Sequence, residues 1–206
     1  MARSKMKIIP LKKKHLPKAA TLLALAFLKD PLFKYYTKSI KKEKEQKKTL
    51  KSLITEDIEM HIENDHPVYG IKKGKKIIGL ISMQKVAANI SPFKYIKSFF
   101  RLLKKGVSIL VILRVIKFAV KTRSFGTKDH HYISHLAVHP HHQKKGIGKK
   151  LMTFMTTHAK KLNPTKGIGL STNNIKNLSF YGKSQYRVFK KKRFSKFTRF
   201  SLIKKD

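Results

Sequence analysis

A strand that leads through two glycines into a helix is the feature that most constrains the fold of this chain. Residues 130–140 read HHYISHLAVHP, which is typical of a strand. Residues 146–162 read GIGKKLMTFMTTHAKKL, and their apolar side chains recur at helical spacing: Ile147, Leu151, Phe154, Met155 and Leu162. The sequence therefore predicts a strand–loop–helix junction, with Gly146 and Gly148 where the helix begins.

Helices and strands are predicted on both sides of this junction. Residues 5–11 indicate an opening strand, and a helix runs from Leu16 to before Asp30. Residues 42–64 predict a second helix whose buried face carries Leu50, Ile54, Ile58 and Ile62. Residues 68–84 indicate a hairpin, 166–172 a strand, 174–183 a short helix and 186–203 two strands. We expect one α+β domain spanning residues 1–206, built on a central sheet.

Residues 91–125 are an insertion that resolves into two helices when it is broken at Gly106. The first is expected to bury four apolar side chains: Phe93, Ile96, Phe100 and Leu103. The second has a narrow polar stripe, and its uncharged run from 107 to 113 is far shorter than the ~20 residues needed to cross a bilayer. For residues 107–121 we favour burial against the body, as a lid over a substrate site, or in a homodimer, over docking on a membrane surface.

The formal net charge of +39 suggests polyanion partners, but its distribution favours a compositional origin. Lysines occur along the whole chain and far outnumber arginines, although arginine is the better residue for bidentate phosphate recognition. We therefore expect non-specific polyanion binding at low salt. The absence of cysteine excludes disulfides, cysteine-based zinc sites and a thiol nucleophile.

The histidines near the junction do not form a convincing metal site. Six of them lie in the stretch from 130 to 142, but Asp129 is the only carboxylate between Asp65 and Asp206. Metal-bound imidazoles normally need neighbouring carboxylates that fix their tautomers. We expect no metal.

The glycines of the junction indicate an anion site. Gly146 and Gly148 allow the backbone to approach a ligand closely, and the N-terminus of a helix offers unpaired N–H groups. Lys144, Lys145 and Lys149 add positive charge, so a pyrophosphate would fit there. The loop is neither a P-loop, because the Gly-Lys-Ser/Thr ending is missing, nor a Gly-x-Gly-x-x-Gly dinucleotide motif.

Two stretches of the chain resemble motifs of the GNAT superfamily of N-acetyltransferases. LAVHPHHQKKGIGKKLM resembles the acyl-CoA-binding motif, with matches at Leu136, Val138, Pro140, Gln143, Gly146 and Gly148. STNNIKNLSFYGKSQYRVF resembles the second motif, with matches at Thr172, Asn174, Asn177, Phe180 and Tyr181, but Gln185-Tyr186 replaces a Gly-Phe turn. The resemblance covers nearly the whole chain except 91–125, and residues 131–148 are most similar to the branch containing puromycin N-acetyltransferase. It implies a central mixed sheet flanked by helices.

The resemblance implies that acetyl-CoA is the acyl donor. Its pantetheine arm would run beside Leu136, Ala137 and Val138, and its pyrophosphate would lie on the amides of Gln143, Lys144, Lys145, Gly146, Ile147 and Gly148, with Lys149 nearby. A main-chain N–H near Ala137 or Val138 would face the thioester carbonyl. Asn174 and Asn177 would hydrogen-bond the arm or cap the helix.

In the family, the tyrosine that matches Tyr181 protonates the departing CoA thiolate, so Tyr181 is the main catalytic candidate. Relatives place a glutamate as base on the strand at 131–138 or at the position of Ser171, and this chain has neither. Asp129, His131 and His135 are the candidate bases, and a water chain is the alternative.

We therefore predict an N-acetyltransferase in which an amine of a small molecule or protein attacks acetyl-CoA directly. The alternative is a catalytically silent fold of this kind that serves as a basic binding module for nucleic acid or ribosomes. The first residues, MARSKMKIIP, lack an apolar stretch of signal-peptide length, so we expect a cytoplasmic protein.

Overall fold

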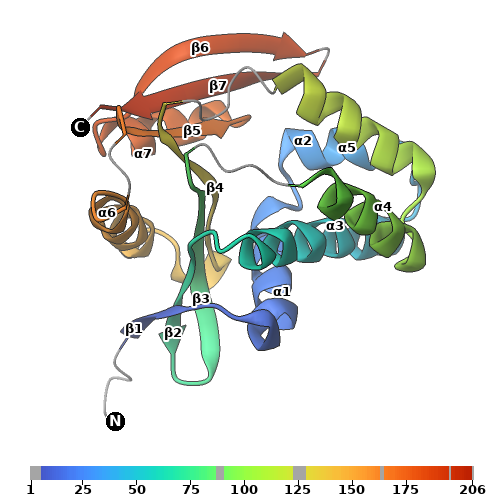
Figure 1. Cartoon of the computed structure of the whole chain (residues 1–206), viewed down its shortest axis with the longest axis horizontal. Coiled ribbons are helices and arrows are strands. Elements are labelled where there is room, and N and C mark those ends of the chain that lie inside the picture. The colour runs from blue at the N-terminus through green and yellow to red at the C-terminus, as the bar shows by residue number, and fades with distance from the viewer. Residues whose placement is uncertain (1–5, 87–90, 123–128, 163–164, 195, 206) are drawn as a thin grey trace.

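The computed structural model describes residues 6–86, 91–122, 129–162, 165–194 and 196–205. Its strands form one seven-stranded sheet in the order β1-β2-β3-β4-β5-β7-β6 (Figure 1). Neighbouring strands are antiparallel except β4 and β5, which are parallel. The strands are β1 Met6–Pro10, β2 Val68–Lys73, β3 Lys76–Gln84, β4 His131–Val138, β5 Ile168–Thr172, β6 Arg187–Phe194 and β7 Phe197–Lys204. The prediction of an α+β fold with a central mixed sheet is confirmed.

Helices cover both faces of this sheet. They are α1 Leu16–Phe27, α2 Pro31–Tyr36, α3 Glu43–Glu63, α4 Pro92–Lys104, α5 Ile109–Thr122, α6 Ile147–Ala159 and α7 Leu178–Gly182. The short α2 is absent from the sequence prediction, although its start has a clear signal. Asp30 accepts a hydrogen bond from the Leu32 N–H at 2.8 Å, and Pro31 occupies the first helical position.

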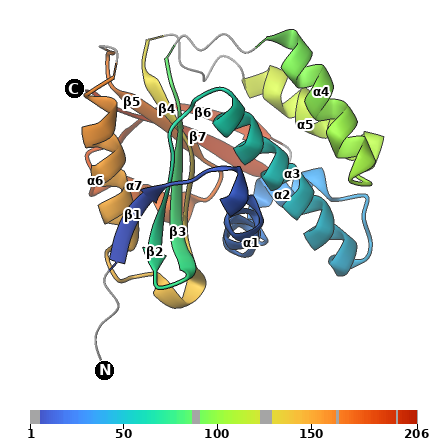
Figure 2. The same ribbon diagram turned by 60° about the horizontal axis from the view of Figure 1, so that its bottom comes forward.

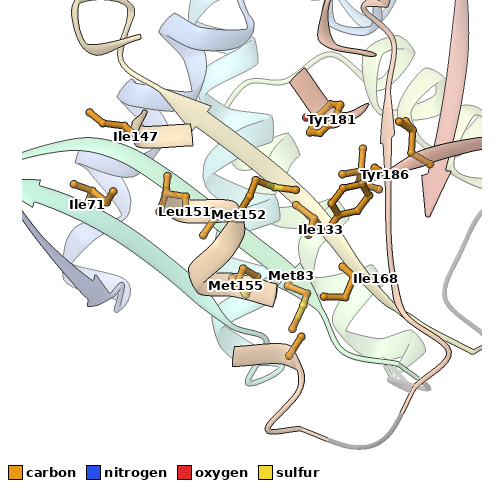
Figure 3. Close-up of a cluster of buried hydrophobic side chains, with 14 of the residues drawn as sticks. Ile71, Met83, Ile133, Ile147, Leu151, Met152, Met155, Ile168, Tyr181 and Tyr186 are labelled. Atoms are coloured by element: carbon orange, nitrogen blue, oxygen red, sulfur yellow. The ribbon is translucent and has the colours of Figure 1, made fainter. Parts of the chain in front are cut away.

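Two apolar cores lie on opposite faces of the sheet. On one face α6 buries Leu151 and Met155 completely, in a cluster that also contains Ile133, Tyr181 and Tyr186 (Figure 3). On the other face α1 and α3 pack on β3, and the predicted α3 residues Leu50, Ile54 and Ile58 are buried there. The sheet is therefore held in place from both sides around β3 and β4.

The sheet splits where β4 and β5 part. These two strands pair only at His131, Tyr132 and Ile133 of β4. β5 goes on to pair with β7 through Ser171 and Thr172, whereas the rest of β4 stays with β3. In Figure 1, β3 and β4 run away from the layer of β5, β6 and β7. One edge of β4 from Ser134 to Val138 is thus left without a partner strand in the described chain.

The insertion contains two helices separated at Gly106, as predicted, but the buried face of α4 was predicted wrongly. Phe93, Ile96, Phe100 and Leu103 are exposed, with 71, 53, 56 and 36% of their surface accessible, and Leu102 is the buried residue of this helix. The physical reason lies on α3, where the Glu56 side chain is only 3% exposed and pairs with Arg101 at 2.6 Å. Pairing this buried carboxylate turns the Arg101 side of α4 inward and its apolar side outward.

The burial predicted for the second helix holds for only one side of α5. Val111, Ile112 and Phe118 are buried in a third apolar cluster. The opposite side exposes five large apolar side chains: Ile109, Leu110, Leu113, Ile116 and Val120. Residues 123–125 of the predicted insertion lie outside the described residues.

Candidate functional site

Main-chain groups of β4 line the split in the sheet. The His139 N–H donates to the Ile78 carbonyl at 2.9 Å, and the register pairs Ala137 with Leu80. In antiparallel pairs the hydrogen-bonding residues alternate, so the main chain of Ala137 faces β3, whereas that of Leu136 and Val138 faces the split. Of the two N–H groups considered for a thioester carbonyl, only that of Val138 points toward the space between β4 and β5.

The loop between β4 and α6 has the conformation of an anion-binding turn. Lys144 and Gly146 both take left-handed backbone angles, with φ of 58° and 75°. Nothing lies within 4 Å of a Cβ built on Gly146, so this position needs glycine for its backbone angle and not for space. α6 then begins at Ile147, which leaves the first N–H groups of the helix without helical acceptors. Gln143 turns its side chain back and donates to the Val138 carbonyl at 3.0 Å.

Gly148 brings the two sequence motifs into contact. A Cβ at this position would lie 3.2 Å from the Phe180 ring and 3.9 Å from the Val138 side chain. Glycine therefore lets α7 approach the start of α6 closely. The strand, the loop and the second motif converge at this point.

Tyr181 follows Phe180 and is buried, with 9% of its surface exposed. Burial raises the pKa of its hydroxyl, so the phenol stays protonated. Among the described residues this hydroxyl has no hydrogen-bond partner. The side chain combines a protonated donor with a position beside the split.

The turn after Tyr181 is well formed despite the missing Gly-Phe pair. The Tyr186 N–H donates to the Tyr181 carbonyl at 3.1 Å, and the Gln185 N–H donates to the Gly182 carbonyl at 2.9 Å. This bond pattern is a Schellman motif, which requires a left-handed residue after the helix. Gln185 takes that conformation with φ of 68°.

The two asparagines of the second motif have partners within the protein. The Asn174 side chain accepts from the Lys176 N–H at 3.0 Å and caps the turn at 175–177. The Asn177 amide donates to the Thr172 hydroxyl at 3.2 Å. These contacts support a capping role for Asn174.

The three candidate bases lie in different surroundings. Asp129 is exposed, pairs with Lys166 at 3.4 Å, and precedes β4 at the end far from the glycine loop. His131 is 1% exposed and its Nδ1 accepts from the Val86 N–H at 3.0 Å. His135 lies at the split, and its Nε2 is 3.0 Å from the Asp57 carboxylate.

Asp57 and His61 join His135 in a polar cluster between α3 and β4 that sequence analysis did not identify. The His61 Nδ1 is 2.8 Å from the Asp57 carbonyl, and its Nε2 is 2.9 Å from the Ser134 hydroxyl. Desolvation raises the pKa of Asp57, but the neighbouring His135 and His61 outweigh it and bring the pKa to about 2. The i, i+4 spacing of Asp57 and His61 on a helix was the available signal.

Ser82 of β3 completes the cluster. Its hydroxyl is 2.8 Å from the His135 Nδ1 and is fully buried. Both ring nitrogens of His135 are therefore engaged, one with a hydroxyl and the other with a carboxylate that is half exposed. A buried hydroxyl and a carboxylate thus flank the two ring nitrogens of this imidazole.

Among the residues that the structure describes, no group of three or more His, Asp or Glu side chains is arranged so that it could hold a metal ion. The rings of His141 and His142 lie 5.4 and 5.9 Å from that of His139.

Residues 31–185 match the profile of the acetyltransferase (GNAT) family. The chain belongs to this family. No curated protein sequence matches it. The family resemblance inferred from the two motifs is thereby confirmed, and the narrower similarity to the puromycin N-acetyltransferase branch stays a prediction.

Solved structures share the GNAT fold with this chain at low sequence identity. A Corynebacterium glutamicum structure described as histone acetyltransferase HPA2 and related acetyltransferase has a TM-score of 0.65 at 14% identity, over 97% of this chain and 96% of that one. The PaiA N-acetyltransferase of Thermoplasma acidophilum, solved with coenzyme A, has a TM-score of 0.57 at 14% identity, over 97 and 99%. The Escherichia coli ribosomal-protein-S18-alanine N-acetyltransferase has a TM-score of 0.57 at 12% identity, over 97 and 92%. Structural similarity at such low identity establishes the fold alone. The acceptor must be inferred from the site.

Proposed function

We propose that this GNAT protein is an N-acetyltransferase that transfers the acetyl group of acetyl-CoA directly to an amine. The observation that carries the proposal is the contact of Val138, Gly148 and Phe180, which puts an unpaired strand edge, an anion-binding loop and Tyr181 at one place. The strand edge matches the amide-rich arm of acetyl-CoA, the loop matches its pyrophosphate, and Tyr181 matches the leaving thiolate.

Coenzyme binding would use main-chain groups for most of its contacts. Along the open edge of β4, Leu136 offers its N–H and C=O groups to the pantetheine amides, because the Val138 C=O accepts from Gln143. The N–H groups from Lys144 to Gly148 would surround the pyrophosphate, since that of Gln143 donates to the Pro140 carbonyl, and Lys144, Lys145 and Lys149 would neutralise its charge. The Val138 N–H would donate to the thioester carbonyl and stabilise the negative charge that develops there.

The acetyl transfer needs two proton movements and no covalent enzyme intermediate. The amine nitrogen forms a bond to the thioester carbon, and collapse of the tetrahedral intermediate breaks the carbon–sulfur bond. Tyr181, kept protonated by burial, would donate its proton to the CoA thiolate. A base must accept the proton that the attacking amine loses.

We assign the base to His135 acting with Asp57. With Asp57 ionised, the His135 Nε2–H donates to the carboxylate at 3.0 Å and Nδ1 accepts from the Ser82 hydroxyl. The Ser82 hydroxyl would take the amine proton while it passes its own proton to Nδ1. The carboxylate would stabilise the resulting imidazolium, and its exposed side would attract a protonated amine. Asp129, paired with Lys166 at the other end of β4, is not used in this scheme.

This assignment predicts a change in the pH dependence of kcat/KM. Asp57→Asn removes the charge that stabilises the imidazolium, so the acidic limb should move to lower pH and the plateau should fall about tenfold or more. Asp129→Asn, the matched control, should leave the profile unchanged. A normal acidic limb in Asp57→Asn would show that a different group or a water chain is the base.

Titration calorimetry with CoA, followed by an amine screen that measures thiol release, tests the proposed function. Gly146→Ala should weaken CoA binding, because alanine at φ of 75° is strained by roughly 1–2 kcal/mol and shifts the loop. Gly182→Ala is the control, since this exposed glycine has nothing within 4 Å of an added Cβ and no left-handed angle. Failure of the wild-type chain to bind CoA at millimolar concentration would favour the alternative of a catalytically silent, basic binding module.

A further inference from the structure

The insertion presents an apolar surface to solvent on both of its helices. We call this the insertion face, and it consists of Phe93, Tyr95, Ile96, Phe100 and Leu103 of α4 and Ile109, Leu110, Leu113, Ile116 and Val120 of α5, which are 36 to 71% exposed. Figure 1 and Figure 2 show the two helices next to each other at the end of the molecule opposite α6. Concentrated exposure of this kind marks an interaction surface, whereas single exposed apolar residues do not.

The inward charges of the insertion are neutralised within the protein. Arg101 binds Glu56 at 2.6 Å and Glu63 at 3.1 Å, and Lys105 binds Glu56 at 3.0 Å. Three of the chain's ten carboxylates, Glu56, Glu59 and Glu63, face this side of α4. The insertion is therefore anchored to the body by ion pairs, and its apolar side stays exposed to solvent.

The charged side chains beside the insertion face are all lysines. Lys97 and Lys104 of α4 and Lys117 and Lys121 of α5 are exposed, and none of their ammonium groups forms a salt bridge to a described residue. At about 100° per residue, each pair lies next to the exposed apolar side chains of its own helix. Residues 66–128 contain no Asp or Glu at all.

We infer that the insertion face docks on the surface of an anionic lipid bilayer. Apolar side chains flanked by lysines are the composition of helices that lie in a membrane interface. Lysines near an anionic leaflet strengthen such binding by electrostatic attraction. In the described chain no helix is both long enough and apolar enough to cross a membrane, so the contact would lie at the interface.

Charge complementarity favours an anionic bilayer over a second copy of the chain or a nucleic acid as the partner of the insertion face. A second copy of the chain would bring the lysines beside one insertion face against those of the other, between two molecules of net charge +39 each. A nucleic acid would attract the lysines but would leave ten apolar side chains in water. An anionic bilayer satisfies the lysines and buries the apolar groups.

Sedimentation of the purified full chain with vesicles tests the inference without acetyl-CoA or an amine, so it is independent of the proposed function. Vesicles of phosphatidylglycerol mixed with phosphatidylcholine should bind the chain, and pure phosphatidylcholine should bind it far less. Replacing Ile96, Phe100, Leu113 and Ile116 by serine should weaken binding to the anionic vesicles about tenfold or more. These side chains are exposed, so circular dichroism should show an unchanged fold.

Two matched controls make the test specific. Serine at Leu25, Ile175, Val188 and Phe189, which are exposed elsewhere, should leave binding unchanged. Replacing Lys97, Lys104, Lys117 and Lys121 by glutamine should weaken binding more than the same change at Lys41, Lys44, Lys48 and Lys51 on or just before α3, because both variants have the same net charge.

Three results would overturn the inference. Equal binding of the insertion-face serine variant and the wild-type chain would reduce the effect to charge adsorption. Equal losses of vesicle binding in the two lysine variants would also indicate charge adsorption alone. A wild-type dimer in sedimentation equilibrium that the serine variant dissociates would assign the insertion face to a second copy of the chain.

Discussion

Tyr181 combines burial with a hydroxyl that no described residue binds, and this combination leads to a specific kinetic prediction. Tyr181→Phe keeps the ring that packs on Phe180, with ring centroids 5.2 Å apart, and removes only the proton donor. We expect kcat to fall about 10²-fold while CoA affinity stays unchanged. Calorimetry with CoA and initial rates of thiol release measure the two effects, and normal turnover in this variant would exclude Tyr181 from the mechanism.

Gln185 is a second residue whose backbone angle leads to a prediction. It ends the α7 turn with φ of 68°, a conformation that glycine adopts without strain. Gln185→Gly should therefore raise the free energy of unfolding by about 1 kcal/mol. The control is Lys183→Gly, where φ is −62° and glycine should destabilise the helix end. Urea unfolding of both variants measures these stability changes. A loss of stability in Gln185→Gly would contradict the prediction.

At the scale of elements, α4 is held on α3 by Arg101. The Glu56 side chain is only 3% exposed, so removing its partner leaves a buried charge with Lys105 alone. We expect Arg101→Met to lower the free energy of unfolding by about 3 kcal/mol. Lys104→Met, on the exposed side of the same helix, should change it by less than about 0.5 kcal/mol.

The same ion pairs predict an acid-dependent stability. Hydrogen bonds from Arg101 and Lys13 lower the pKa of Glu63 from 4.5 to about 2. Because the pKa is lower in the folded chain, this contribution to stability is present above pH 4.5 and is lost as the pH falls to 2. Urea midpoints between about pH 5 and pH 3 should drop less steeply in Arg101→Met than in Lys104→Met, and parallel slopes would show that Glu63 does not depend on Arg101.

For the whole molecule, a charge of +39 affects which amines can reach the site. A strongly positive surface repels polycations, so neutral or acidic amines should be better acceptors than spermidine. We expect no saturation with spermidine at physiological salt, and a rate that rises with ionic strength as screening increases. Steady-state kinetics with acetyl-CoA measure both effects, and saturation by spermidine at physiological salt would contradict this prediction.

The sequence alone determined the elements and the motifs, because both depend on short-range spacing. Helical and strand periodicity predicted α1, α3, α6 and the β2–β3 hairpin, and the glycine pattern located the loop at residues 143–148. The motif from Thr172 to Tyr181, together with that loop, was sufficient to indicate the family. These features are local, since each is fixed by side chains within a few residues of one another.

Tertiary structure decided which faces meet, and local spacing cannot supply that information. An apolar stripe on α4 indicated burial, but the buried carboxylate of Glu56 attracted Arg101 and turned the stripe to solvent. Asp57 comes to lie 3.0 Å from His135 although the two are far apart in the sequence, and the pairing of Val138 with Gly79 decides which N–H groups face the split. Such contacts depend on how the helices pack on the sheet, because the cost of leaving a charge or a hydrogen-bonding group unpaired is set by its surroundings in the folded chain.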